Sequence, residues 1–246
     1  MPSRDIRTQR LFIDADLTAN GEIALSREQA NYVRNVLRLP AGAEILVFNG
    51  LDGEWRGRLK DTGRRSVLLV VEAQTRRQTL PGTLAYVFAP LKHARLDYMV
   101  QKAVEMGVAE ITPVMTRHTQ VARVNVERMR ANVIEAAEQC GILSIPTVHE
   151  PVAFDRWIAA LDADRVIVFC DEDAATGNPL EALKRTPPGP AVLLIGPEGG
   201  FEESERRALL KRERVVRLSL GPRILRADTA AVAALALVQA AIGDWR

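Results

Sequence analysis

The chain has 246 residues, of which 47% are hydrophobic, enough for a substantial core and for two domains. A formal net charge of +2 points to no class of partner, and Cys140 and Cys170 are too few and too far apart for a disulfide framework or a zinc site. No apolar run reaches the ~18 residues of a membrane span and the start is no signal peptide, so we expect a soluble cytoplasmic protein. From the cysteine count we also expect no bound metal.

Short β-type runs dominate residues 1–75, which we interpret as a small β-barrel domain. The runs cover 11–14, 44–49 and 66–71, and Gly50-Leu-Asp-Gly53 gives the turn of a hairpin. Between the first two runs, a short helix over 26–38 begins at the N-cap Ser26. The first 80 residues hold 13 Lys or Arg against 10 Asp or Glu. That mildly basic balance is by itself typical of a solvated surface.

A polar linker over 76–82 separates this domain from a second one over 83–246, where strand-like and helical runs alternate. The expected strands lie at 84–89, 110–114, 166–170, 192–195 and 215–220, and the expected helices near 95–106, 125–139, 154–161, 202–213 and 228–242. Apolar runs without alternation are typical of parallel strands covered on both faces, so we expect an α/β domain. The last helix is apolar all round, which predicts a fully buried helix.

Two Gly-Pro turns follow buried strands, at the edge where a parallel sheet binds its ligand. One is Gly196–Gly200 and the other begins at Gly221. A single turn of this kind can be purely structural, but two in one domain favour a binding site. Neither a G-x-G-x-x-G nor a P-loop motif is present, and the acidic helix start at 202–205 disfavours a phosphate. We therefore expect an adenine-type ring held by backbone groups.

The three histidines favour neither a metal site nor a nucleophile. His93, His118 and His149 share no ligand spacing, and the sequence has no G-x-S-x-G elbow. We interpret all three as surface or loop residues, although His118 follows a strand beside Arg117, where a substrate could reach it.

Two segments, Leu194–Phe201 and Leu220–Ala230, closely resemble the signature of the bacterial 16S ribosomal RNA (uracil-N3)-methyltransferase family of the SPOUT superfamily. The resemblance continues in the family's order along essentially the whole chain. Its further matches are Val36–Arg38, Gln101–Gly107, Ile111–Pro113, Glu135–Gly141 and Pro146. One departure is Thr116-Arg-His-Thr119, where the family usually has Glu-Arg-Ser or Glu-Arg-Cys.

The resemblance implies an RNA-binding, PUA-like β-barrel followed by a parallel-sheet methyltransferase domain tied in a trefoil knot. It further implies S-adenosylmethionine as cofactor, a homodimer, and methylation of N3 of a uridine in 16S ribosomal RNA of the small ribosomal subunit. Two alternatives remain open. The chain could methylate another RNA, or it could be an inactive RNA-binding or ribosome-assembly protein of the same fold.

The loops and the resemblance together define three groups of candidate site residues. We expect the cofactor to contact Leu194, Ile195, Gly196, Pro197, Gly199, Gly200, Leu218, Leu220, Gly221, Ile224, Leu225, Thr229 and Ala230. We expect RNA to contact Arg7, Arg10, Arg34, Arg38, Arg117 and Arg223. In catalysis, Arg226 would stabilise charge spreading to uracil O2 and O4, while Glu198 or Asp228 accepts the N3 proton. Asp228 could instead be only the N-cap of the last helix, and Glu198 could be purely structural.

Overall fold

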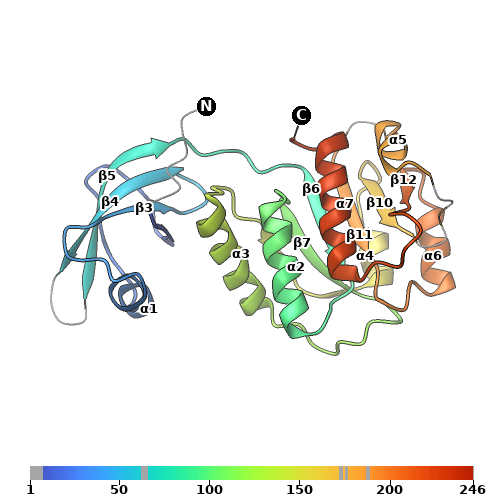
Figure 1. The fold of residues 1–246 in the computed structure, drawn as a ribbon, viewed down its shortest axis with the longest axis horizontal. Helices are drawn as coiled ribbons and strands as arrows, with labels where there is room; N and C mark the ends of the chain where they lie inside the picture. Colours follow the sequence, from blue (N-terminus) through green and yellow to red (C-terminus); the bar gives the residue numbers. More distant parts are fainter. Residues whose placement is uncertain (1–7, 62–65, 172–173, 175–176, 187–188, 246) are drawn as a thin grey trace. The chain divides into compact units, whose positions relative to one another are not determined.

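A computed structural model describes residues 8–61, 66–171, 174, 177–186 and 189–245. The chain forms two compact units, Met1–Leu80 with Ala137–Ile145, and Pro81–Ala136 with Pro146–Arg246 (Figure 1). The division falls within the polar stretch that the sequence indicated, but Ala137–Ile145 joins the first unit although it lies far along the chain. The division of the chain into domains over 1–75 and 83–246 with a linker over 76–82 stays a prediction.

The first unit is a five-stranded sheet in the order β1-β3-β4-β5-β2. Its strands are β1 (Arg10–Phe12), β2 (Glu22–Ala24), β3 (Glu44–Phe48), β4 (Glu54–Asp61) and β5 (Val67–Arg76). β1 pairs with β3 in parallel, and the other pairs are antiparallel. Alternate residues of β3 and β5, including Ile45, Leu69 and Val71, are fully buried in one core.

The helix expected over 26–38 is present, but it is divided in two. Ser26 and Gln29 form a reciprocal capping box at the start of α1 (Arg27–Asn31). The chain then continues as the π-helix η1 (Tyr32–Val36) and places Val33 in the core.

The segment Ala137–Ile145 is attached to the first unit by polar contacts with three of its residues. The backbone N–H of Phe12 donates to Glu138 at 2.8 Å. Arg76 donates to the carbonyl of Gly141 at 3.0 Å, and Gln78 donates to the carbonyl of Leu143 at 3.3 Å. These contacts involve backbone groups and long side chains, which leave no pattern in the sequence.

The second unit is a parallel sheet with the strand order β12-β10-β11-β6-β7-β8, to which β9 adds by pairing with β7. The strands are β6 (Leu84–Phe88), β7 (Glu110–Met115), β8 (Thr147–Val148), β9 (Val152–Ala153), β10 (Val166–Cys170), β11 (Ala191–Ile195) and β12 (Val215–Leu218). β6 and β11 are buried at every position. The expected parallel-sheet α/β architecture is therefore confirmed, while the trefoil knot stays a prediction.

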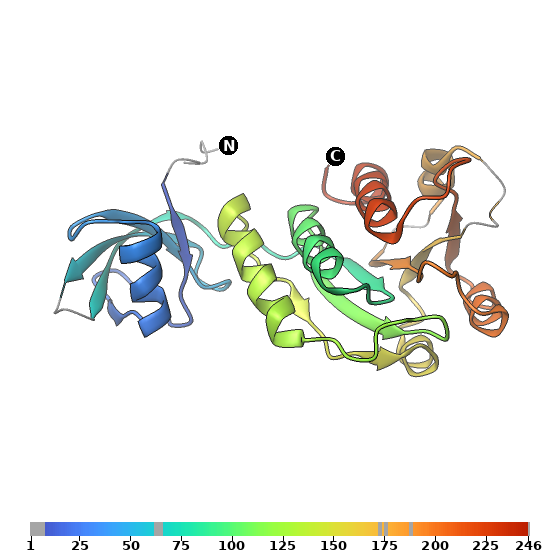
Figure 2. The same cartoon turned by 60° about the horizontal axis from the view of Figure 1, so that its bottom comes forward.

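Helices cover both faces of this sheet (Figure 2). They are α2 (His93–Glu105), α3 (Val126–Cys140), α4 (Phe154–Ala160), α5 (Pro179–Lys184), α6 (Glu203–Leu210) and α7 (Ala227–Ile242). α7 packs beside α2 and α5 (Figure 1), and α4 packs on α6. The short α5, which begins at the N-cap Asn178 and Pro179, was not expected. No helix in the described ranges has both the length and the apolar character needed to cross a bilayer.

The expectation that α7 is buried all round is wrong for the single chain. Ala231, Ala234 and Leu235 are buried, but the opposite side of the helix is partly or fully accessible. That accessible side contains Val232, Ala233, Ala236, Leu237, Ala240 and Ala241. The helix therefore presents an apolar face to its surroundings.

One stability prediction follows from the buried ion pair of the first unit. Arg10 donates to Glu54 at 2.9 Å, and both side chains are almost fully buried. We expect Glu54→Gln to lower the free energy of unfolding by roughly 3–5 kcal/mol, because the buried guanidinium loses its counter-charge. Urea denaturation of the full chain measures the change.

The control for this prediction is Glu72→Gln. Glu72 pairs with Arg56 and Arg58 at the surface, where solvent screens the charges, so a much smaller loss is expected. Equal losses in the two variants would contradict a special role for the buried pair.

Candidate functional site

A cavity of about 350 Å³ opens at the carboxyl ends of β12, β10 and β11, which are neighbours in the sheet. We call it cavity A. The chain leaves these strands at Asp171, Gly196 and Ser219, and the loops that follow form the walls. Three adjacent parallel strands thus end at one place, which is the usual ligand position of an open α/β sheet. The volume is in the range of about 300–1,000 Å³ typical of small-molecule sites.

Cavity A is lined by ten of the thirteen residues predicted to contact a cofactor. They are Ile195, Gly196, Pro197, Gly200, Leu218, Leu220, Gly221, Ile224, Leu225 and Ala230. Most of their side chains are apolar or absent, so the walls present hydrocarbon and exposed backbone. Such a surface suits a flat ring that is recognised by hydrogen bonds along its edge.

Three predicted residues do not line cavity A in the described structure. Leu194 is fully buried, because neighbouring side chains of a strand point to opposite faces of the sheet and Ile195 takes the cavity side. Gly199 lies against His118, and Thr229 is exposed on the first turn of α7.

Glycine is required at Gly196 and Gly221 for different reasons. A Cβ on Gly196 would lie 2.5 Å from the ring of Phe201, which packs over the loop. Gly221 has φ +98°, a conformation that other residues rarely adopt, and space around it is open. Both features let backbone, rather than side chains, form the wall of cavity A.

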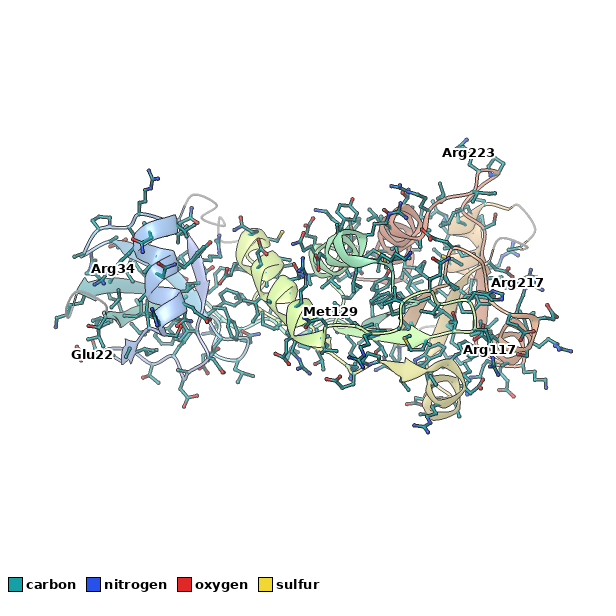
Figure 3. The ribbon with its side chains drawn as sticks, turned by 90° about the horizontal axis from the view of Figure 1, so that it is seen from below. Glu22, Arg34, Arg117, Met129, Arg217 and Arg223 are labelled. Atoms are coloured by element: carbon teal, nitrogen blue, oxygen red, sulfur yellow. The ribbon has the colours of Figure 1, made fainter. Side chains whose placement is uncertain are left out.

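The polar end of cavity A, at the carboxyl end of β10, was not predicted from the sequence. The carboxylate of Asp171 is buried and accepts hydrogen bonds from Arg217 at 2.7 Å and Arg206 at 3.1 Å. Arg206 lines the cavity beside Asp171, and Figure 3 labels Arg217. The strand 166–170 was expected, but it ends without a Gly-Pro turn and was therefore not treated as part of the site.

Cys170 also lines cavity A, at the last position of β10. Burial raises the pKa of its thiol to about 12, and the neighbouring Asp171 carboxylate adds to the increase. Since the thiolate is the nucleophilic form of cysteine, a raised pKa lowers the reactivity of this residue at neutral pH.

A second cavity, of about 370 Å³, opens on the other side of the Gly196–Gly200 loop. We call it cavity B. Pro197 and Glu198 line both cavities. The remaining walls of cavity B are Pro90, Leu91, Lys92 and Arg95 after β6, and His118, Gln120 and Val121 after β7. The two cavities therefore lie at the same edge of the sheet, with the loop after β11 between them.

Each of the three predicted catalytic residues takes part in an ion pair. Glu198, between the cavities, pairs with Arg95 at 2.6 Å. Arg226 pairs with Asp228 at 3.4 Å; the Arg226 side chain is largely exposed, and Asp228 is buried. The alternative interpretation of Asp228 as an N-cap is wrong, because the N-cap of α7 is Arg226 and Asp228 lies in the first turn.

The predicted RNA-binding arginines differ in how accessible they are. Arg10 is buried against Glu54, so the prediction that it contacts RNA is wrong. Arg34 donates to the carbonyl of Ser66 at 2.8 Å and stays partly accessible. Arg38, Arg117 and Arg223 are exposed. Arg7 lies outside the described residues. Figure 3 shows Arg223 projecting away from the ribbon.

No group of three or more His, Cys, Asp or Glu side chains in the described ranges is arranged to hold a metal ion. The polar side chains that line cavity A are those of Asp171, Glu198, Arg206, Ser219 and Arg223, beside exposed backbone.

Comparison with known proteins identifies both parts of the chain. Residues 78–239 match the family model of the RNA methyltransferase domain, and residues 25–72 match that of the RNA methyltransferase PUA domain. The ribosomal RNA small subunit methyltransferase E of Rickettsia conorii is 29% identical over 95% of this chain and 96% of its own length. The protein of the same name from Bacillus subtilis is 27% identical over 94% and 95%.

Two solved structures resemble the whole chain. The ribosomal RNA small subunit methyltransferase E of Neisseria gonorrhoeae, bound to S-adenosylmethionine, has a TM-score of 0.87 and 26% identity, covering 98% of this chain and all of that one. A Legionella pneumophila protein in complex with bound SAM has a TM-score of 0.82 and 30% identity, covering 96% and 98% of the two chains.

The environment of Cys170 yields a prediction about its reactivity. With a pKa of about 12, the thiolate fraction at pH 8 is about 10⁻⁴, against about a quarter for an ordinary cysteine. We expect iodoacetamide to modify Cys170 at least about a thousandfold more slowly than it modifies an unstructured cysteine peptide. Mass spectrometry of the peptide containing Cys170 gives the rate.

The same measurement in urea is the control, because unfolding should restore ordinary reactivity. Rapid modification of the folded protein would contradict the burial of this thiol.

Proposed function

The chain belongs to the RNA methyltransferase family, and from that premise we propose that it transfers a methyl group from S-adenosylmethionine to N3 of a uridine in 16S ribosomal RNA of the small subunit. The observation that carries the proposal is cavity A, which is formed by the two Gly-Pro loops after β11 and β12 together with the end of β10, the strand between them. We also propose that the protein is cytoplasmic, because its proposed substrate is part of the ribosome.

Cavity A fits the chemical parts of S-adenosylmethionine. Ile195, Leu218 and Leu225 offer apolar contact to the faces of an adenine ring, and the backbone near Gly196 and Gly221 can approach its edge. Asp171 and Arg206 form a polar end suited to the charged groups of the methionine part. Glu202, Glu203 and Glu205 begin α6 beside the loop and disfavour a polyphosphate in the same place.

When bound, S-adenosylmethionine supplies a methyl group on a positively charged sulfur. The chain's own task is to position the base and to ease the loss of its N3 proton. The Arg226 guanidinium supports this role, because it follows Leu225, which lines cavity A, and is itself largely exposed. From there it can stabilise charge that develops on uracil O2 and O4.

We assign RNA binding to the first unit together with exposed arginines of the second. Arg34 and Arg38 on the first unit, and Arg117 and Arg223 on the second, are accessible for phosphate contacts. The target base would have to leave its stack to reach the site. RNA binding should weaken steeply with salt, as phosphate contacts require.

A homodimer is also part of the proposal. Supporting it is the accessible apolar face of α7, which consists of small and branched aliphatic residues and would be shielded from water by a second copy of the chain.

Methyl transfer to small ribosomal subunits from a strain lacking the activity tests the proposal. Nucleoside analysis of the 16S RNA should reveal N3-methyluridine. Incorporation into a different RNA would support the first alternative, a methyltransferase with another substrate. RNA binding without incorporation would support the second, an inactive binding protein.

Arg226→Ala tests the proposed stabilisation of charge on the base. We expect the single-turnover methylation rate to fall about a hundredfold or more, with little change in the dissociation constants of cofactor and RNA. Arg226→Lys should recover part of the rate, because it keeps the charge and loses the planar fork.

Arg223→Ala is the matched control on the same loop. Its defect should appear in RNA affinity and disappear at saturating RNA, since Arg223 is assigned to phosphate contact. If saturating RNA also restores the Arg226→Ala rate, Arg226 is a binding residue rather than a catalytic one.

Leu237→Glu tests the dimer. A carboxylate on the accessible face of α7 would have to be buried at the proposed interface, which is costly. We expect analytical ultracentrifugation to find a dimer for the unmodified chain and a monomer for the variant. Lys211→Glu, an exposed change just after α6, is the control and should stay dimeric. A monomeric unmodified chain would contradict this part of the proposal.

A further inference from the structure

His118 lies in a turn whose backbone is fixed by hydrogen bonds. The turn follows β7, and the hydroxyl of Thr119 accepts the N–H of Thr116 at 2.9 Å. The backbone N–H of Arg117 donates to Glu205 at 2.9 Å, and Glu205 is buried in the first turn of α6. These bonds hold His118 at the wall of cavity B, so its position does not depend on a substrate.

The contacts of the His118 ring determine which nitrogen carries the proton in the neutral form. Nδ1 lies 3.1 Å from the carbonyl oxygen of Gly199 and 3.0 Å from that of Gly200. Since carbonyl oxygens only accept hydrogen bonds, Nδ1 must be the donor. In the neutral imidazole, Nε2 then has a free lone pair, and it makes no hydrogen bond to the described part of the chain.

The side chains that line cavity B include the hydrogen-bonding types that uracil requires. The Watson–Crick edge of uracil has an N3–H donor between two carbonyl acceptors, O2 and O4. Cavity B is lined by His118, whose Nε2 is an acceptor, by Lys92, Arg95 and Gln120, which carry donors, and by Glu198, a further acceptor that is paired with Arg95. Cytosine has a lone pair at N3 and an amino group at C4, so it would oppose acceptor to acceptor at the imidazole.

We propose that His118 is the catalytic base of the reaction, accepting the N3 proton of a uracil bound in cavity B. The inference rests on the proposed function and names the site of the target nucleotide. Cavity A and cavity B meet at Pro197 and Glu198, so a methyl donor in the first and a base in the second are neighbours.

The N3 proton moves to Nε2, and the N3 electron pair forms the bond to the methyl carbon. The carbon–sulfur bond breaks with its electron pair on sulfur, so the sulfonium becomes a neutral thioether. The imidazolium then releases its proton to water. Glu198 and Asp228, the bases expected from sequence, are paired with Arg95 and Arg226.

Several charged residues line cavity B with His118 or lie next to it in the chain. Lys92 and Arg95 come from the start of α2, Glu198 comes from the loop after β11, and Arg117 precedes His118 in the turn. Among these types of side chain, only an imidazole ordinarily changes its charge between about pH 5 and 8. A loss of methylation rate on the acid side in this range would therefore report the histidine.

The first test measures the tautomer in the full-length protein by long-range proton–nitrogen NMR. Only three histidines contribute signals, and His118→Gln identifies the one concerned. We expect the Nδ1–H form, with a change at Nε2 when uridine 5′-monophosphate is added beside S-adenosylhomocysteine, and a weaker change with cytidine 5′-monophosphate. An Nε2–H tautomer, or equal responses to the two nucleotides, would overturn the inference.

The second test compares pH profiles of single-turnover methylation at saturating cofactor and RNA. His118→Gln should lower the rate about a hundredfold or more and remove the acid-side loss, while calorimetric affinity for S-adenosylmethionine stays unchanged. His149→Gln, a histidine paired with Glu110 away from both cavities, is the matched control and should behave as the unmodified chain.

The outcomes separate this inference from the proposed function. An unmodified chain that methylates uridine, with an equally active His118→Gln variant, overturns the role of His118 alone. An unmodified chain that methylates no RNA overturns the proposed function, and the NMR titration still decides whether cavity B binds uracil. If His118→Gln is misfolded by circular dichroism, His118→Asn replaces it in the same comparison.

Discussion

The exposed backbone of the loop after β11 is the feature on which the rest of the site depends. β11 lies between β10 and β6, so its loop borders whatever binds on either side. On one side Gly196 lacks a side chain, which lets Phe201 pack closely and leaves backbone at the wall of cavity A. On the other side the carbonyls of Gly199 and Gly200 orient the ring of His118 in cavity B. One short loop thus shapes both cavities.

The parallel sheet explains why these groups come together. All strands of the second unit run the same way, so residues far apart in sequence, such as Asp171, Gly196 and His118, emerge at one edge. Fully buried strands such as β6 and β11 give that edge a rigid base. Rigid strand ends with short loops position reacting groups closely, which is most of what a methyl transfer requires of a protein.

Sequence patterns predicted the parts of this molecule that depend on local physics. Buried strands and the N-cap Ser26 follow from apolar runs and capping chemistry, and the ten cavity residues follow from the Gly-Pro turns together with the family resemblance. Properties that arise from contacts between distant segments were missed. The sequence does not distinguish Arg10 from an exposed arginine, because its partner Glu54 lies on another strand. Asp171 likewise forms the polar end of cavity A only through its ion pairs with Arg206 and Arg217. The accessible face of α7 was likewise not predicted, because an apolar helix has the same sequence pattern whether its own chain or a second chain covers it.

The central claim, that two neighbouring cavities receive cofactor and base on either side of one loop, is tested most directly by amide NMR titration of the full chain. S-adenosylhomocysteine should shift the amides of Gly196 and Gly221 and leave those of Arg95 and Gln120 nearly unchanged. A short uridine-containing RNA added next should shift the second pair while the first stays in its bound position. Displacement of the cofactor product by the RNA, with both sets of amides responding to either ligand, would contradict two separate cavities.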